Sequence, residues 1–353
     1  MLELLIASAL GVVVIWAATE SYMTTRTLNR TALNRVDIQQ DIRLATSKIS
    51  QDAQMAGSFG CANLSQNAAN VMLSSAGDGL IFGSNIASNQ WTNIDETSSS
   101  NMGNYGAAIL NSPPTITGFT AKTGTKALFF QYGIGSTLLQ SGGTGSTLKF
   151  DANIAQPELL RSSGIFALTS CKRMDVINSG VSLSSSSFSV DLPSGVTLSK
   201  SASYDPSKEH SQTEIQLLRF VAHLYAIGTY NYNGKDTTGL YLFALEDGGV
   251  WGDPELISEH IDSLDAIFNF AKACKAEQPE TELNLEKFAF DRNILVDGGD
   301  KLAPMSLVFN LGTKAVTTDN LDGTTTTKNT ENYQMTALIR GGNVCADRSM
   351  VTN

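Results

Sequence analysis

The chain has 353 residues, and 42% of them are hydrophobic, which is enough for a sizeable core. Its formal net charge is −10 at pH 7. Residues 1–56 hold five basic and five acidic side chains, so the acidic excess lies in residues 57–353. An acidic surface without clustered Lys or Arg is a poor non-specific binder of nucleic acid, so we expect no direct nucleic-acid binding.

The first eighteen residues, MLELLIASALGVVVIWAA, contain one charged side chain, Glu3. As a helix they would be roughly 27 Å long, close to the hydrocarbon thickness of a bilayer. A secretory signal peptide would have Lys or Arg before its apolar run, and none precedes the run here. After Ala18 the chain has no proline or glycine until Gly57, so we predict one helix of about fifty residues.

The second half of this helix is predicted to be amphipathic. Apolar side chains recur there mostly at intervals of three or four residues, at Leu28, Ala32, Ile38, Ile42, Ala45, Ile49 and Ala53. Charged residues lie between them, at Arg30, Arg35, Asp41, Arg43, Lys48 and Asp52. This pattern predicts one stripe that packs on a globular domain and a charged face that points to water.

The remaining chain divides by composition into residues 57–210 and 211–353. The first part is rich in Ser, Thr, Gly and Asn, with short β-prone runs such as ALFFQYG, and is predicted to be a β-rich, loop-heavy insertion. The second part has longer strand-like runs separated by turns, as in an antiparallel sheet. For residues 253–270 the pattern leaves helix and strand both open, although Asp253 and Pro254 suit a helix start. The predicted fold class is α+β, a long amino-terminal helix on a β-rich head.

Four cysteines, Cys61, Cys171, Cys274 and Cys345, lack CxxC spacing. With only three histidines, far apart in the sequence, a zinc site is disfavoured and two disulfides in an oxidising compartment are expected. The sequence permits all three connectivities. We predict Cys61 with Cys171 and Cys274 with Cys345, because each pair lies within one of the two regions.

No motif indicates catalysis. The chain has no GxSxG, HExxH or Walker-type sequence, so we expect no enzyme and no cofactor. A histidine-dependent triad could use only His210, His223 or His260, and His223 lies in an apolar run typical of a core. The acidic turns at Asp319 and Asp322 suit calcium weakly, and ordinary turns are the preferred interpretation because the EF-hand spacing is absent.

The amino-terminal segment resembles the mature start of type IV pilins and type II secretion pseudopilins, in which a glutamate lies near the beginning of an apolar helix. The order HLYAIG, GLYLFALEDGG, ELISEHIDSLDAIFNF and YQMTALIRGG resembles PilW-like minor pilins. The first match covers about fifty residues and the second residues 215–343, while residues 62–210 match no family.

The resemblance implies a processed precursor. If Glu3 is the family's fifth mature residue, the native protein begins two residues earlier, after cleavage by a prepilin peptidase that also methylates the new terminal amine. The family's helix-kinking proline is missing, since the first proline is Pro113, so an unbroken helix is expected.

The resemblance also implies a function. Glu3 would pair with the terminal amine of a neighbouring subunit, because an unpaired carboxylate at bilayer depth costs about 2.5 to 3.5 kcal/mol. Partners would be other pilin subunits and the pilus assembly machinery, in a homo- or hetero-oligomeric filament. The location would be the inner membrane before assembly, then an extracellular pilus on a Gram-negative cell. Helix packing in the filament would use Leu4, Leu5, Ile6, Val12, Val13, Ile15 and Trp16.

These features predict a minor pilin that primes assembly at or near the tip and supports motility, adhesion or DNA uptake. Two alternatives remain open. One is a major filament-forming pilin decorated by residues 62–210, and the other is a single-pass anchored adhesin or binding module.

Overall fold

A computed structural model describes two kinds of structure, one long helix and a β-rich head. The described residues are 2–63, 72–73, 106–111, 113–140, 147–151, 164–177, 181–183, 187–192, 194–201, 203, 205, 208–232, 234–246, 250–271, 285–288, 304–319, 325–328 and 330–339. The predicted α+β class is confirmed at this level, since a single long helix precedes a mostly antiparallel β domain.

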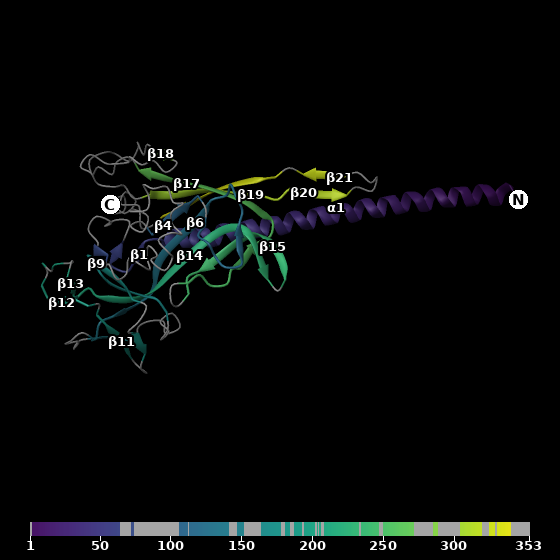
Figure 1. Ribbon diagram of the computed structural model, residues 1–353. Coiled ribbons are helices and arrows are strands. Elements are labelled where there is room, and N and C mark those ends of the chain that lie inside the picture. The colour runs from purple at the N-terminus through teal and green to yellow at the C-terminus, as the bar shows by residue number, and fades with distance from the viewer. Residues whose placement is uncertain are drawn as a thin grey trace, which may run out of the picture.

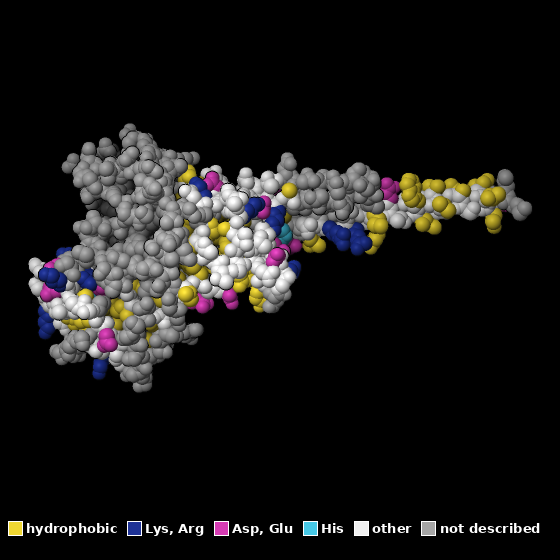
Figure 2. All heavy atoms as spheres, in the orientation of Figure 1, with side chains coloured by type: hydrophobic (Ala, Val, Ile, Leu, Met, Phe, Trp, Pro, Cys, Tyr) yellow, Lys and Arg dark blue, Asp and Glu magenta, His cyan; other side chains and the backbone are white. Residues whose placement is uncertain are grey.

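Helix α1 (Leu2–Met55) runs without interruption for 54 residues. At 1.5 Å per residue it is about 81 Å long. Its amino-terminal part projects from the head, and its last turns enter the head (Figure 1). The side chains of the projecting part are largely hydrophobic near the free end (Figure 2). The prediction of one continuous helix of about fifty residues is therefore confirmed.

Two glycines define how the chain leaves α1. Gly57 has φ 77°, a left-handed conformation that ends helices at low steric cost. Its amide donates to the carbonyl oxygen of Gln131 at 2.9 Å, which ties the helix end to a strand. Gly106 lies against this turn, and a Cβ there would stand 1.9 Å from the Gly57 nitrogen. The close approach of the two backbones requires glycine at position 106.

A nine-stranded sheet forms the centre of the head (Figure 1). Its main path runs β16–β15–β14–β8–β9–β3, and β4, β5 and β6 join through pairs of β6 with β4 and of β14 with β5 and β6. The strands are β16 (Glu255–Ser258), β15 (Lys235–Ala244), β14 (Gln216–Tyr232), β8 (Phe166–Ser170), β9 (Arg173–Ile177), β3 (Met72–Leu73), β4 (Ala107–Leu110), β5 (Phe119–Ala121) and β6 (Ala127–Leu138).

Strand β14 joins the two regions that composition separates. One of its partners, β15, follows residue 210 in the sequence, whereas two others, β6 and β8, precede it. The expected boundary at residue 210 therefore separates strands that the structure joins in one sheet.

A four-stranded antiparallel sheet, in the order β18–β17–β19–β22, forms the second layer. Its strands are β18 (Leu285–Phe288), β17 (Ile261–Ala271), β19 (Pro304–Thr313) and β22 (Asn332–Leu338). Smaller sheets are β10 (Val181–Leu183) with β11 (Ser187–Asp191) and β7 (Thr147–Asp151), β12 (Thr197–Ser199) with β13 (Glu209–Ser211), β1 (Ser58–Phe59) with β2 (Ala62–Asn63), and β20 (Val316–Asp319) with β21 (Thr325–Lys328).

Strands β16 and β17 settle the open choice for residues 253–270. Burial along β17 alternates, with Leu264, Ala266 and Phe268 inside. That period of two is the period of a strand, and pairing with β18 and β19 uses the backbone groups that a helix would bond internally. The helix alternative is wrong here, because sheet pairing overrides a favourable helix start.

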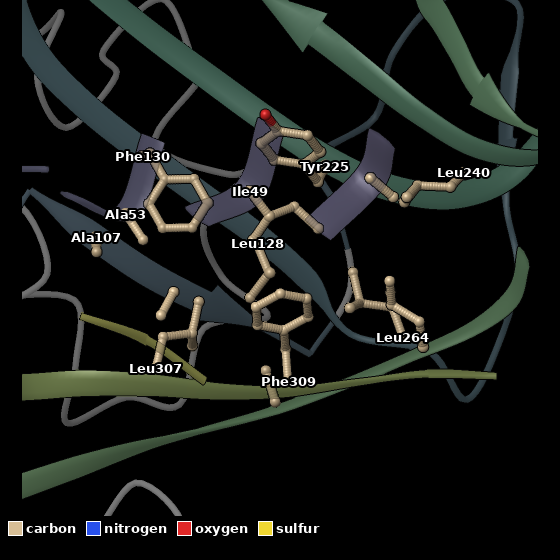
Figure 3. Packing of buried hydrophobic residues seen from close by; sticks show 14 of the residues in the cluster. Ile49, Ala53, Ala107, Leu128, Phe130, Tyr225, Leu240, Leu264, Leu307 and Phe309 are labelled. Carbon is tan, nitrogen blue, oxygen red and sulfur yellow. The ribbon is translucent and has the colours of Figure 1, made fainter. Parts of the chain in front are cut away.

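One hydrophobic core unites α1 with both sheets. Ala45, Ile49 and Ala53 of the helix, and Ala56 directly after it, are fully buried. They pack among side chains from the two sheets, as Figure 3 shows for Ile49 and Ala53. The sheet residues labelled there are Ala107, Leu128, Phe130, Tyr225, Leu240, Leu264, Leu307 and Phe309.

Two further cores complete the head. The odd-numbered Tyr225 and Ile227 of β14 join the helix core, whereas the even-numbered Phe220, Ala222 and Leu224 face the core on the opposite side of the sheet. A third core lies under the β7, β8 and β11 strands, at Leu148, Phe150, Phe166, Leu168, Ile177, Phe188, Val190, Ile215 and Leu217. Because successive side chains of a strand point to opposite faces, β14 contributes to the cores on both sides of its sheet.

The predicted docking stripe is correct in its second half only. Ile42, Ala45, Ile49 and Ala53 are buried, but Leu28 is 65% exposed and Ala32 is also exposed. Among the described side chains, burial on the helix becomes regular only from about residue 38 onward, so Leu28 and Ala32 stay outside the docked part.

Replacing Ile49 with Ala should lower the free energy of unfolding by about 2 to 5 kcal/mol, because the side chain is fully buried and leaves a cavity. The matched control is Leu33→Ala, which shortens a side chain that is 64% exposed. The control should change the free energy of unfolding by no more than about 0.5 kcal/mol. Denaturant unfolding of the full chain in detergent measures both, and equal losses would contradict the described docking.

Candidate functional site: the exposed amino-terminal helix

The amino-terminal part of α1 is apolar and exposed on all sides. Exposed fractions include 78% for Leu4 and 68% for Trp16. The seven side chains predicted to pack in a filament are all exposed in the single chain, namely Leu4, Leu5, Ile6, Val12, Val13, Ile15 and Trp16. The helix is long and apolar enough to cross a membrane, and no part of its most apolar stretch is buried.

This surface needs a non-aqueous partner. Burying one large aliphatic side chain contributes about 1.5 to 3 kcal/mol, so the seven together represent roughly 10 to 20 kcal/mol. A helix that is apolar on all sides normally lies in lipid or among other helices. The head offers no such cover for it, because its contacts begin further along the chain.

Glu3 lies in the first turn of α1 and is exposed. An acidic side chain there interacts favourably with the positive end of the helix dipole. Within the residues that the structure describes, Glu3 forms no ion pair. Its carboxylate is thus available to a group outside the chain.

A threonine-rich stalk connects the apolar part to the docked part. Five threonine hydroxyls donate to the carbonyl oxygen four residues earlier, at Thr19, Thr24, Thr25, Thr27 and Thr31. These bonds satisfy the hydroxyls within the helix. These bonds lie within the helix itself, so they support the helical conformation of the stalk locally.

The docked end of α1 is fixed by a buried carboxylate. Asp52 accepts hydrogen bonds from the hydroxyls of Tyr132 at 2.7 Å and Tyr225 at 2.6 Å. Its second oxygen also lies 2.8 Å from Nδ1 of His223. The prediction that Asp52 faces water is wrong, since it is 5% exposed. Three partners from β6 and β14 replace the water that the carboxylate loses.

A second polar contact lies nearer the point where α1 leaves the head. Asp41 accepts from the hydroxyl of Ser258 at 2.8 Å and lies 2.8 Å from Nδ1 of His260. Lys48 forms an ion pair with Glu255 at 2.6 Å. Together with Asp52, these contacts fix the rotation of the helix relative to β16 and β14. They join the docked end of α1 to the head at three points along the helix.

Alkaline pH should weaken this joint. Burial and the neighbouring Asp52 raise the pKa of Tyr132 and the pKa of Tyr225 well above the usual value of about 10. Below pH 10 both tyrosines are protonated in the folded and the unfolded chain. Above it the unfolded chain loses protons that the folded chain keeps, so the free energy of unfolding should fall by up to about 2.7 kcal/mol per pH unit.

Tyr225→Phe separates this effect from general alkaline unfolding. Between pH 10 and 11 the variant should have a shallower pH slope, by up to about 1.4 kcal/mol per pH unit, because one of the two protons bound beside Asp52 is gone. Tyr232→Phe, which changes a 68% exposed ring, is the matched control and should keep the original slope. Identical slopes in all three proteins would contradict the linkage.

His210 forms a buried chain of contacts that resembles a hydrolase triad in composition only. Its Nδ1 lies 3.0 Å from the hydroxyl of Ser170, and its Nε2 lies 2.6 Å from Asp175. A serine hydrolase uses the opposite ring nitrogens. Arg173 donates two hydrogen bonds to Asp175, and Ser170, Asp175 and His210 are completely buried. A substrate cannot reach Ser170 in this arrangement, which instead stabilises the interior.

A disulfide joins two hairpin turns beside this cluster. Cys61 follows Gly60 in the turn between β1 and β2, and Cys171 lies in the turn between β8 and β9. The prediction of Cys61 with Cys171 is confirmed. It links the segment directly after α1 to the central sheet.

The remaining predicted residues fall outside the described part of the chain. Cys274, Cys345 and Asp322 are not among the described residues. Asp319 ends β20, but its side chain is not described. The second disulfide and the calcium interpretation stay predictions.

No protein-family model, curated protein or solved structure matches the chain. The structure itself gives the class of the fold as α+β, in which a β-rich head follows a helix that could anchor in a membrane.

Proposed function

We propose that this protein is a non-enzymatic filament subunit of the type IV pilin class, most similar to PilW-like minor pilins. The observation that carries the proposal is the division of α1 into two halves. One half is fixed in the head by the helix core and by Asp52, and the other is apolar and exposed throughout. Such a helix fits two environments in turn, the inner membrane and a bundle of like helices.

The two environments explain how assembly can be favourable. Transfer from lipid to a helix bundle keeps the apolar side chains out of water, so most of the hydrophobic energy is unchanged. Specificity must then come from polar pairing, and Glu3 is the one charged side chain among residues 1–18. In this proposal Glu3 pairs with the terminal amine of a neighbouring subunit and sets the register of the incoming helix.

The size of the head supports a low-copy role. Several sheets and three hydrophobic cores follow α1, which makes a densely repeated arrangement crowded. The protein would therefore prime assembly at or near the tip of an extracellular pilus, with the pilus machinery as a partner. Motility, adhesion or DNA uptake would be the cellular outcome.

Photo-crosslinking tests this proposal. A photoreactive residue at position 12, in place of exposed Val12, should form adducts with other pilin subunits in sheared filaments. The same residue at position 149, in place of exposed Lys149 on β7, is the matched control and should not capture those helices. Adducts should disappear in cells without prepilin peptidase. Membrane anchoring that is independent of this peptidase, without subunit adducts, would instead indicate an anchored binding module.

A further inference from the structure

Two exposed arginines lie next to each other on the stalk of α1. Arg26 and Arg30 are exposed and lie four residues apart, on one face of the helix. Like charges at this spacing repel each other, and no acidic residue stands three or four positions from either one. In the part of the chain that the structure describes, neither arginine forms an ion pair.

The distance of these arginines from the apolar segment corresponds to the headgroup layer of a bilayer. A hydrocarbon core of about 30 Å holds about 20 helical residues, which extends from Glu3 to about Tyr22. Tyr22 is 66% exposed, and tyrosine favours this boundary. Arg26 then lies about 6 Å beyond the boundary and Arg30 about 12 Å. Their long side chains can bend back to phosphate groups at these depths.

We propose that Arg26 and Arg30, with Tyr22 beside them, form a binding site for the phosphate groups of anionic phospholipids. The inference rests on the membrane-inserted state of the proposed function. Tyr22, Arg26 and Arg30 follow one another at four-residue intervals, so one lipid headgroup can contact both guanidinium groups while its acyl chains lie along the apolar helix.

The acidic head of a neighbouring subunit is a poorer partner for these arginines. Several head carboxylates are already paired with lysines, Glu255 with Lys48, Asp262 with Lys122 and Asp265 with Lys126. Lipid binding also has a structural consequence. It fixes the depth of α1, so Ile42, the first fully docked residue of the helix, is held about 28 Å from the edge of the hydrocarbon core, the length of helix from Met23 to Ile42.

Trp16 provides the measurement. It lies ten residues before Arg26, at about the depth of the acyl chains of a lipid bound there. The full chain is placed in vesicles of phosphatidylcholine and phosphatidylglycerol, with brominated chains on one lipid at a time, and Trp16 fluorescence is recorded. Trp16→Phe supplies the background from Trp91 and Trp251. The expected preference for phosphatidylglycerol is about fivefold for each arginine.

The R26Q/R30Q variant should lose this preference, and high salt should weaken it in the wild type. R43Q is the matched control, since Arg43 is exposed but lies about 30 Å beyond Met23. It should keep the preference.

Three outcomes would overturn the inference. The first is that Trp16 is quenched but the wild type shows no preference for phosphatidylglycerol, or R26Q/R30Q keeps that preference. This result overturns the lipid site and leaves the filament proposal intact. Unchanged lipid preference with loss of filament incorporation would assign the arginines to a subunit contact. No quenching by either brominated lipid would show that α1 is not inserted, which contradicts the membrane step of the proposed function as well.

Discussion

Replacing Glu3 with Ala should lower incorporation into filaments by about two to four orders of magnitude. Removing one partner of a buried ion pair leaves the other charge uncompensated, at a cost of about 3 to 5 kcal/mol. In the proposed assembly that other charge is the terminal amine of the neighbouring subunit. Membrane insertion should be unchanged or stronger, because the variant is more apolar. Quantitative mass spectrometry of sheared filaments and of membranes measures both fractions.

Glu20→Ala is the matched control for this prediction. Glu20 is the next acidic residue on α1 and is also exposed, but it lies about 25 Å further along the helix. Its loss should leave incorporation near the wild-type level. Glu3→Gln keeps the shape without the charge and should behave like Glu3→Ala. Normal incorporation of Glu3→Ala would remove the register role of Glu3.

Replacing Cys61 and Cys171 together with Ser should have the largest effect on stability. The bond spans 110 residues, and the chain-entropy relation gives about 4.8 kcal/mol for a loop of this length. Measured losses for native disulfides are typically about 2 to 5 kcal/mol. Denaturant unfolding of the full chain should report a loss in this range.

A C274S/C345S variant tests the second predicted bond in parallel. Both double variants should be compared with and without reductant, and non-reducing peptide maps should recover Cys61 linked to Cys171. A map that links Cys61 to any other cysteine would contradict the structure. Unchanged stability in C61S/C171S would show that the bond contributes little to the folded state.

The helix was predictable from sequence because its signals are local. An apolar run, the absence of proline and the first glycine after it at position 57 determine where α1 extends and ends. The docking stripe at Ile42 to Ala53 follows from helical periodicity. Leu28 has the same spacing, but the packing of the head decides which turns are covered, and Leu28 stays exposed.

Long-range pairing explains what the sequence could not predict. Residues 264–268 alternate in burial because they form a strand that pairs with β18 and β19, although the same apolar residues also suit a helix. Asp52 lies on the helix as one more acid. Its partners Tyr132 and Tyr225 are 80 and 173 residues away, so nothing local marks it as buried.

The proposed role of Glu3 involves a second subunit, and the fold of one chain supplies only the Glu3 half of that contact. The structure describes an exposed apolar helix with an unpaired acid in its first turn. In the proposed filament, the partner that completes the site lies on another chain. The disulfide of Cys61 with Cys171, by contrast, was predictable because both cysteines lie within residues 57–210.

Imaging of purified filaments and their tips at near-atomic resolution tests the central claim most directly. The account predicts that this chain is present at the tip and absent from the repeating shaft, with α1 in the helical bundle and Glu3 beside the amino terminus of a neighbour. A continuous array of this chain along the shaft would contradict the minor role. Its absence from both tip and shaft, with the head spread over the cell surface, would contradict the filament function itself.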